Sequence, residues 1–186
     1  PMHMDTQGLS TQDALKLAFD LLGDEYQVSP LPGQPVRLRV EGHLWMMAEL
    51  AGVEQDGVFC RLRRNPQGNL TRAVRYHTVN DGRMYGVIGG EPITLQAGDV
   101  LAISSDDPYV ADLEEFRGSF ISMSTATLGV EGVDTMGYRV LERGAPVTRM
   151  LKSSIGGFFA GLRDGVTIGE ARALARLLRG ALEQHL

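Results

Sequence analysis

The sequence predicts a mainly β domain: a jelly-roll barrel of antiparallel strands, with a short helix before it and two helices after it. Apolar and β-branched runs recur at short intervals between residues 29 and 138, with turn residues between them. Most of the 23 glycines lie between residues 42 and 137, which suits a domain with many turns. Within residues 93–103, Gly98 and Asp99 separate two β-branched runs, and we expect them to form a tight two-residue reversal.

The first 26 residues are predicted to form an arm that carries a short helix. Residues 10–13 (Ser-Thr-Gln-Asp) match a helix-capping pattern, apolar residues follow them, and Gly23 suits the end of the helix. Residues 1–4 resemble a processing remnant, with Met4 a possible native start, and no structure is predicted for them. The predicted division of the chain is an arm (1–26), a barrel (27–140) and a helical dimerisation or linker segment (141–186).

The barrel is predicted from short strands separated by turn residues. Residues 36–40 (Val-Arg-Leu-Arg-Val) alternate strictly, as in a half-buried strand. Further strands are expected at residues 44–51, 58–63, 72–79, 84–88, 93–95, 100–104, 109–112 and 117–124. The pairs Asp56-Gly57, Asp81-Gly82 and Gly89-Gly90 indicate hairpin turns between them.

Two helices are predicted after the barrel. Pro146 suits a first helical turn, and residues 167–170 (Thr-Ile-Gly-Glu) form a second capping box. The first helix has an apolar stripe at helical spacing: Leu151, Ile155, Phe158, Phe159 and Leu162. The second has a small and apolar face: Ala171, Leu174, Ala175, Leu178 and Leu182. This face covers the barrel or packs against a second copy of the chain. The two arrangements are compatible, and we expect a homodimer.

The charge distribution and the cysteine count exclude some classes of function. The net charge is −5, with −8 on residues 1–140 and +3 on residues 141–186. An acidic body disfavours nucleic acid as the partner of this chain itself. Cys60 is the single cysteine, which excludes an internal disulfide and fits a reducing cytoplasm. No apolar run has the length of a membrane span, so no membrane partner is expected.

No catalytic or metal-binding motif stands out in the sequence. Metal-dependent barrels of this kind need a His-x-His pair, and His77 in a predicted strand has no such neighbour. Alternation places Cys60 and Leu62 on the face opposite Phe59, so a buried structural thiol is expected rather than a reactive one activated by nearby arginines. Residues 104–107 (Ser-Ser-Asp-Asp) have the composition of a turn. We expect no enzyme activity, no cofactor and no metal.

The interior of the barrel is the expected place for a ligand pocket. Its predicted lining is Trp45, Met47, His77, Tyr85, Phe120 and Met123, and the alternative for each of them is a place in a packed core. The densest basic region comprises Arg61, Arg63, Arg64, Arg72 and Arg75. These arginines either clamp an anion or form a solvated sheet face, and we favour the solvated face.

Four segments resemble the N-terminal regulatory domain of AraC-type bacterial transcription regulators. They are residues 27–30 (Gln-Val-Ser-Pro), 95–101 (Leu-Gln-Ala-Gly-Asp-Val-Leu), 107–109 (Asp-Pro-Tyr) and 116–123 (Phe-Arg-Gly-Ser-Phe-Ile-Ser-Met). Together with the two C-terminal helices, the resemblance covers residues 27–186 and is nearest to the subgroup with a metal-free, cupin-like barrel. It implies a ligand-binding and dimerisation domain followed by a helix-turn-helix module that binds DNA. The chain stops at Leu186, where that module would begin.

The leading hypothesis is therefore a cytoplasmic effector-binding and dimerising domain of an AraC-type regulator. Its partners are an unidentified small-molecule effector and a second copy, and DNA is reached only through a module outside this chain. The alternatives are a small-molecule cupin enzyme, an isomerase or oxygenase, and a stand-alone ligand-binding cupin.

Overall fold

A computed structural model describes residues 2–23, 25–45, 50–66, 73–128 and 137–162, together with residues 167, 169, 170, 172, 173, 176, 177 and 180. Its elements, in order, are β1 (Met2–Asp5), α1 (Thr11–Leu22), β2 (Tyr26–Ser29), β3 (Arg39–Trp45), β4 (Leu50–Arg64), β5 (Ala73–Ile88), β6 (Glu91–Gln96), β7 (Val100–Ser104), β8 (Tyr109–Ser124), α2 (Thr125–Leu128), β9 (Tyr138–Leu141) and α3 (Pro146–Leu162).

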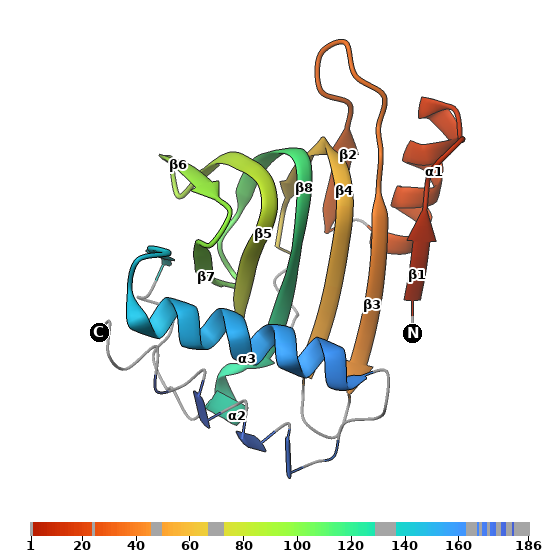
Figure 1. Cartoon of the computed structure of the whole chain (residues 1–186). Helices are drawn as coiled ribbons and strands as arrows, with labels where there is room; N and C mark the ends of the chain where they lie inside the picture. The colour runs from red at the N-terminus through yellow and green to blue at the C-terminus, as the bar shows by residue number, and fades with distance from the viewer. Residues whose placement is uncertain are drawn as a thin grey trace.

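Three long strands, β4, β8 and β5, form the centre of one antiparallel sheet (Figure 1). Two short strands lie end to end along each flank: β3 and β2 both pair with β4, while β7 and β6 both pair with β5. At one end the strand order is β1-β3-β4-β8-β5-β7-β9, which includes all but two of the nine described strands. The mainly β, antiparallel prediction is confirmed.

A crease crosses the middle of the three long strands. The pairing register shifts in β4 between Gln55 and Val58, and in β5 between Val79 and Arg83. A β-bulge or a similar irregularity lies at each shift, and such features bend a strand and increase its twist. In β8, Gly118 lies on the same line, where a Cβ would meet the carbonyl oxygen of Thr78 and the ring of Phe116. Because there is no space for a side chain at residue 118, the bend needs glycine there.

Two of the predicted hairpins are wrong. Asp56-Gly57 and Asp81-Gly82 lie inside the continuous strands β4 and β5, and both strands pair with β8 before and after these residues. Gly57 and Gly82 have φ values of 60° and 72°, which suit a bulge as well as a turn. The third hairpin, at Gly89-Gly90, is confirmed between β5 and β6.

The Gly98-Asp99 turn is also not a reversal. Because β6 and β7 pair with consecutive halves of β5, the chain bends here and continues in the same direction. Gly98 donates its N–H to the carbonyl oxygen of Val79 at 2.8 Å, at the β5 end of the crease. The Asp99 carboxylate accepts the Gln96 N–H at 2.9 Å and the Arg143 N–H at 3.1 Å. This corner therefore joins the crease to the segment that leads into α3.

The predictions for the first 51 residues are confirmed in part. Ser10 caps α1 by accepting the Asp13 N–H, as predicted. No structure was predicted for residues 2–4, but they belong to β1, which pairs with β3, and Met4 is 1% exposed. The predicted strand at residues 44–51 is instead the end of β3 and the start of β4, which pair with each other.

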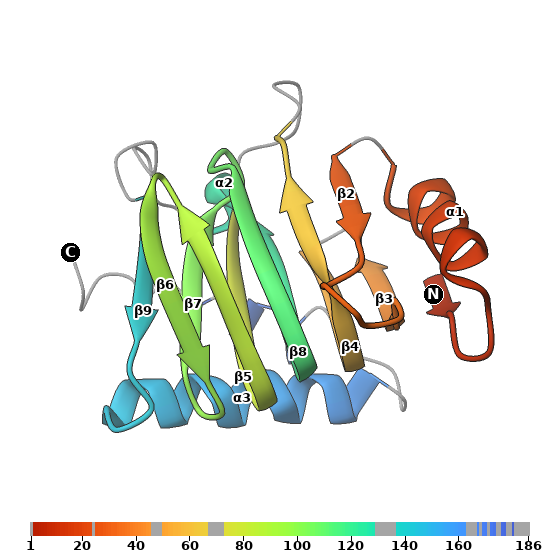
Figure 2. The same cartoon turned by 90° about the horizontal axis from the view of Figure 1, so that it is seen from above.

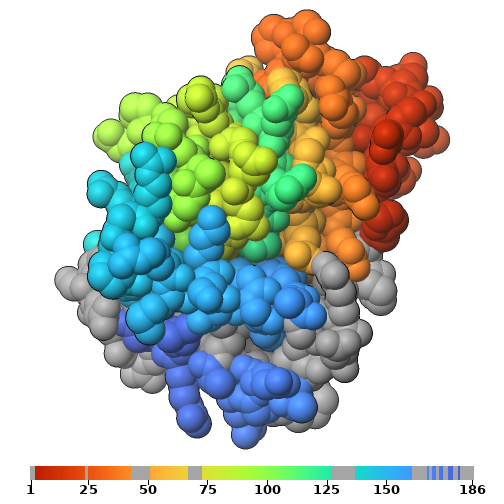
Figure 3. All heavy atoms as spheres, in the orientation of Figure 1, coloured from red at the N-terminus to blue at the C-terminus, as the bar shows by residue number. Residues whose placement is uncertain are grey.

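Helix α3 lies across one face of the sheet (Figures 1 and 2). Its residues Leu151, Ile155, Phe158 and Phe159 are buried, which confirms the described part of the predicted stripe. Lys152 donates to the carbonyl oxygen of Val79 at 3.2 Å and ties α3 to the crease. The space-filling view shows the other side of α3 at the surface (Figure 3). No helix in the described part of the chain is long and apolar enough to span a membrane.

Candidate ligand pocket

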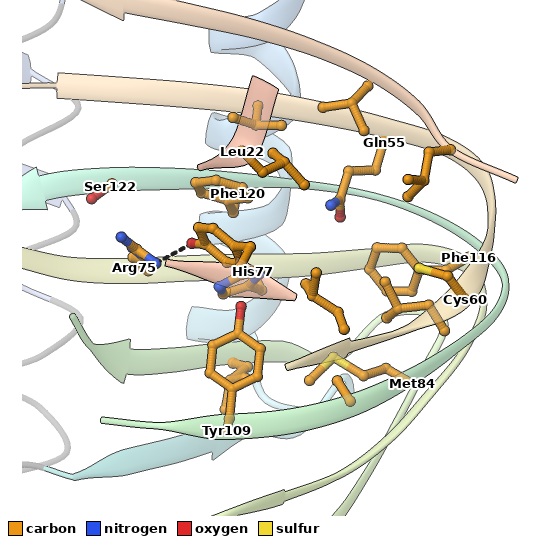
Figure 4. Close-up of a pocket in the computed structure, with 18 of the residues that line it drawn as sticks. Leu22, Gln55, Cys60, Arg75, His77, Met84, Tyr109, Phe116, Phe120 and Ser122 are labelled. Atoms are coloured by element: carbon orange, nitrogen blue, oxygen red, sulfur yellow. Dashed lines mark hydrogen bonds between the residues drawn. The ribbon is translucent and has the colours of Figure 1, made fainter. Parts of the chain in front are cut away.

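The creased sheet wraps around a cavity of about 280 Å³ on the face opposite α3 (Figure 4). Strand β4 lines this cavity on both sides of its register shift, with Val53 and Gln55 before it and Cys60 and Leu62 after it. Without the crease these side chains would lie along a straight strand and would not face one another. The irregularity in β4 therefore brings residues from both halves of the strand into the cavity wall.

Most of the cavity wall is apolar. Phe116 and Phe120 of β8 and Met84 of β5 project into it. Leu21 and Leu22, in the last turn of α1, close one side. An apolar cavity with few polar groups is typical of small-molecule sites.

A buried ion cluster lies at one end of the cavity. One oxygen of Glu25 accepts from Arg64 Nε at 2.6 Å and from Arg75 Nη2 at 3.1 Å. Arg64, whose side chain is fully buried, also donates to the carbonyl oxygens of Ser105 and Asp107. Buried ion pairs need such additional hydrogen bonds to offset the loss of hydration. The cluster connects the turn after α1 to β4, β5 and the loop after β7.

Tyr26 of β2 completes the cluster. Its hydroxyl oxygen accepts from Arg75 Nη1, and its ring lies 5.8 Å from the Arg75 guanidinium carbon and 6.0 Å from that of Arg64. Both distances are within the range of a cation–π interaction.

His77 lies two residues after Arg75 on β5, so the two side chains share the face that lines the cavity (Figure 4). Its ring lies 5.0 Å from that of Phe120 and meets the Tyr109 ring edge-on at 6.4 Å. Burial, together with the positive charges of Arg75 and Arg64, lowers the pKa of His77 to about 3. His77 is therefore neutral at physiological pH.

Three buried polar atoms at this end of the cavity have no hydrogen-bond partner: Arg75 Nε and His77 Nε2 on its lining, and Asp107 Oδ2, which is not on the lining. Most buried polar atoms in proteins are paired, so an unpaired one requires an explanation. Arg75 Nε and His77 Nε2 both belong to side chains that line the cavity, and a ligand would supply the missing partner.

Of the predicted pocket residues whose side chains the structure describes, two line the cavity and two do not. His77 and Phe120 line the cavity and lie against each other. Met123 is buried, but it alternates with Ser122 and so lies on the α3 side of β8. Tyr85 alternates with Met84, and its hydroxyl oxygen accepts from Arg83 at 3.1 Å, away from the cavity.

The other predicted site residues cannot be placed. The side chain of Trp45 and all of Met47 lie outside the described residues, as do Ala171, Leu174, Ala175, Leu178 and Leu182. The capping box before these helix residues is confirmed, because the Thr167 hydroxyl oxygen accepts the Glu170 N–H at 3.2 Å and the Glu170 carboxylate accepts the Thr167 N–H at 2.7 Å.

The prediction that the five arginines form a solvated sheet face is wrong for two of them. Arg61 and Arg63 are exposed, but Arg64 is 1% exposed and Arg75 is 9% exposed. Strand alternation is the signal that distinguishes Arg64, since it shares the inward face with Cys60 and Leu62. Arg72 lies outside the described residues.

Cys60 and the described acidic and histidine side chains indicate neither a reactive thiol nor a metal centre. Cys60 is fully buried in the cavity wall, and this burial, with a smaller effect of Asp112, raises the pKa of its thiol to about 12. The expected structural thiol is confirmed. Within the described ranges, no three His, Cys, Asp or Glu side chains gather closely enough to hold a metal ion.

The comparisons with known proteins agree with this architecture. No protein-family model matches the sequence, and no curated protein matches it. The crystal structure of the AraC-like transcriptional activator CuxR matches with a TM-score of 0.78 and 15% identity, over 97% of this chain and 68% of that chain. The chain has the fold of an AraC-like activator. The resemblance stated from the sequence is confirmed at the level of the fold, which is all that 15% identity shows.

Two further solved structures contain cupin domains. A cupin barrel protein from Salinispora arenicola CNS-205 matches with a TM-score of 0.36 and 20% identity, over 53% of this chain and 88% of that chain. The cupin domain of an XRE family transcriptional regulator from Enterobacter cloacae matches with a TM-score of 0.36 and 14% identity, over 46% and 92%. With TM-scores below 0.5, neither of them carries an argument about this chain.

Proposed function

We propose that this chain is the effector-binding and dimerisation domain of an AraC-type transcription regulator, built on a cupin-like jelly-roll barrel, and that it controls DNA binding by a downstream helix-turn-helix module. One observation carries the proposal. A mainly apolar cavity with two unpaired polar atoms lies inside a fold that matches an AraC-like activator over 97% of the chain. The domain acts in the cytoplasm and catalyses no reaction.

The cavity is connected to the segments that would transmit an effector signal. On one side, Leu22 of α1 and Tyr26 of β2 belong to its wall. On the other side, the crease of β5 contacts α3 through Lys152 and the segment before α3 through Asp99. An effector that fits one arrangement of these segments better than another shifts their population by that difference in affinity.

Dimerisation belongs to the same proposal and rests on the sequence. The apolar face formed by Ala171, Leu174, Ala175, Leu178 and Leu182 suits close packing against the same helix of a second copy. A symmetric pair would place two downstream DNA-binding modules side by side, as a regulator with two half-sites requires.

Two measurements on the purified chain test the proposal. Sedimentation equilibrium should give a dimer at micromolar concentration. A thermal-shift screen of sugars, aromatic acids and fatty acids should reveal at least one class that raises the melting temperature, because a ligand of the native state stabilises it by mass action. A strictly monomeric chain contradicts the dimerisation claim, and stoichiometric bound iron, manganese or zinc favours the enzyme alternative.

A further inference from the structure

Arg75 shares its counter-ion at the polar end of the cavity with a second arginine. Among the described residues that line the cavity, Arg75 is the charged one, and it is 91% buried. Its nearest counter-ion, Glu25, uses one oxygen for both Arg75 and Arg64. Asp107, the other carboxylate at this end, interacts with Arg64. Two guanidinium groups and two carboxylates therefore meet at this end, and, among the described residues, Arg75 shares its one direct carboxylate partner with Arg64.

Two unpaired nitrogen atoms at this end of the cavity can donate hydrogen bonds to a ligand. Arg75 Nε carries a hydrogen that no acceptor receives, and His77 Nε2 is likewise unpaired. A neutral imidazole donates from one ring nitrogen, so His77 supplies a second donor when its hydrogen is on Nε2. A guanidinium N–H and an imidazole N–H on residues two apart in β5, both lining the cavity, match a carboxylate group, which accepts through two oxygens and carries one negative charge.

The rest of the cavity selects against strongly polar ligands. Besides Arg75, His77, Tyr26 and Tyr109, the polar side chains on the described lining are Gln55 and Ser122, while aliphatic and aromatic groups form most of it. A sugar would leave several hydroxyls without partners, and each unsatisfied group weakens binding. A phosphate dianion would need more donors and more positive charge than one shared arginine supplies. The volume, about 280 Å³, is at the lower end for ligand sites.

We propose that the cavity binds a small organic carboxylic acid with an apolar body, whose carboxylate is received by Arg75 Nε and His77 Nε2. This inference rests on the proposed function and names the chemical class of the effector. The apolar body lies among Phe116, Phe120 and Met84, and the carboxylate competes with Glu25 for the charge of Arg75.

Matched pairs of acids and amides test this inference on the full chain by titration calorimetry. The probes are benzoate and benzamide, phenylacetate and phenylacetamide, hexanoate and hexanamide, and octanoate and octanamide. Each pair shares its apolar body and differs in charge. At least one acid should bind about tenfold or more tightly than its amide, because a hydrogen bond to a charged group is stronger than one to a neutral group.

Three variants locate the binding. Arg75→Met should remove the preference for the acid, whereas Arg61→Met, on the exposed face of β4, should leave it unchanged. Glu25→Gln retains a side chain of the same size but removes the competing carboxylate, and it should tighten binding of the acid about threefold or more without changing that of the amide. This variant keeps the test decisive if Arg75→Met does not fold.

Three results would contradict the inference that the cavity binds a carboxylic acid. The inference is overturned if no pair shows a preference for the acid, if Arg75→Met binds the acid as the wild type does, or if Glu25→Gln leaves the affinity for the acid unchanged. A neutral compound that raises the melting temperature in the broader screen would then leave the proposed function intact. If no compound binds in the titrations or in the thermal-shift screen, both this inference and the proposed function are contradicted.

Discussion

Arg61 and Arg64 lie three residues apart in β4 and have opposite environments. Arg61 forms a two-bond pair with Asp112, at 2.6 Å and 2.7 Å, on the exposed face, and its side chain is 48% exposed. Arg64 is buried against Glu25 and two carbonyl oxygens. Surface pairs contribute little to stability, while removing one partner of a buried pair leaves an uncompensated charge.

Replacing these two arginines by alanine should therefore have different effects. Arg64→Ala should lower the free energy of unfolding by about 3 kcal/mol or more, because Glu25 and two carbonyl oxygens lose their partner. Arg61→Ala should lower it by about 0.5 kcal/mol, since solvent screens the exposed pair. Urea denaturation measures both free-energy losses. Equal losses would show that the buried contacts of Arg64 stabilise the protein no more than the exposed pair of Arg61 does.

Cys60 should resist thiol reagents in the native protein. Burial raises the pKa of its thiol to about 12, so at pH 8 almost no thiolate is present and the reagent has no access to it. Ellman's reagent should report no free thiol in the folded chain and one per chain in guanidinium chloride. Rapid labelling of the native chain would mean that the cavity wall opens readily.

His77 should make the protein less stable in mild acid. Its pKa is about 3 in the folded state and near 6.5 when unfolded, so the unfolded chain takes up the proton first and stability falls as the pH drops below 6.5. From pH 6.5 to pH 4.5 this residue should cost about 2 kcal/mol of stability. His77→Gln should lose correspondingly less over the same interval, measured by urea denaturation at each pH. Parallel curves for the two proteins would contradict the low pKa.

The crease shows where sequence patterns and tertiary structure diverge. Asp-Gly is a strong hairpin signal when two strands end at it, but β4 and β5 keep their pairing with β8 through Asp56-Gly57 and Asp81-Gly82. Local sequence does not distinguish a bulge from a turn, because both use a glycine with positive φ. The distinction depends on the partner strand, which lies far away in the sequence. Gly89-Gly90 has no such continuous partner, and its hairpin was predictable.

Gly118 tests the crease at the level of one strand. Gly118→Ala should destabilise the protein by about 1–3 kcal/mol, because its Cβ would overlap the carbonyl oxygen of Thr78 and the ring of Phe116. Gly156 is the matched control, since a Cβ there meets no other atom and α3 gains a better helix former. Gly156→Ala should stabilise the protein by about 0.5–1 kcal/mol. Thermal unfolding distinguishes the two signs, and a neutral Gly118→Ala would contradict the tight packing at the crease.

At the scale of the whole molecule, the sequence predicted the class of fold better than it predicted the site. The alternation of short apolar runs and the capped helices were sufficient for a mainly β domain with helical ends. The pocket depends on how the long strands bend, so only His77 and Phe120, of the predicted residues that the structure describes, line it. Arg64 was predictable as inward-facing from its alternation with Leu62, but alternation did not distinguish Arg75, and both arginines pair with Glu25, which comes from the turn after α1.

The central claim is that the cavity inside the creased sheet is an effector site. Calorimetric titration of the compound that gives the largest thermal shift tests it most directly, with Ala51→Phe filling the cavity and Val87→Phe adding the same ring at an exposed position. The wild type and Val87→Phe should bind one equivalent with equal affinity, and Ala51→Phe should bind at least about tenfold more weakly, a loss of about 1.4 kcal/mol. Wild-type affinity in a folded Ala51→Phe would place the ligand elsewhere and contradict the claim.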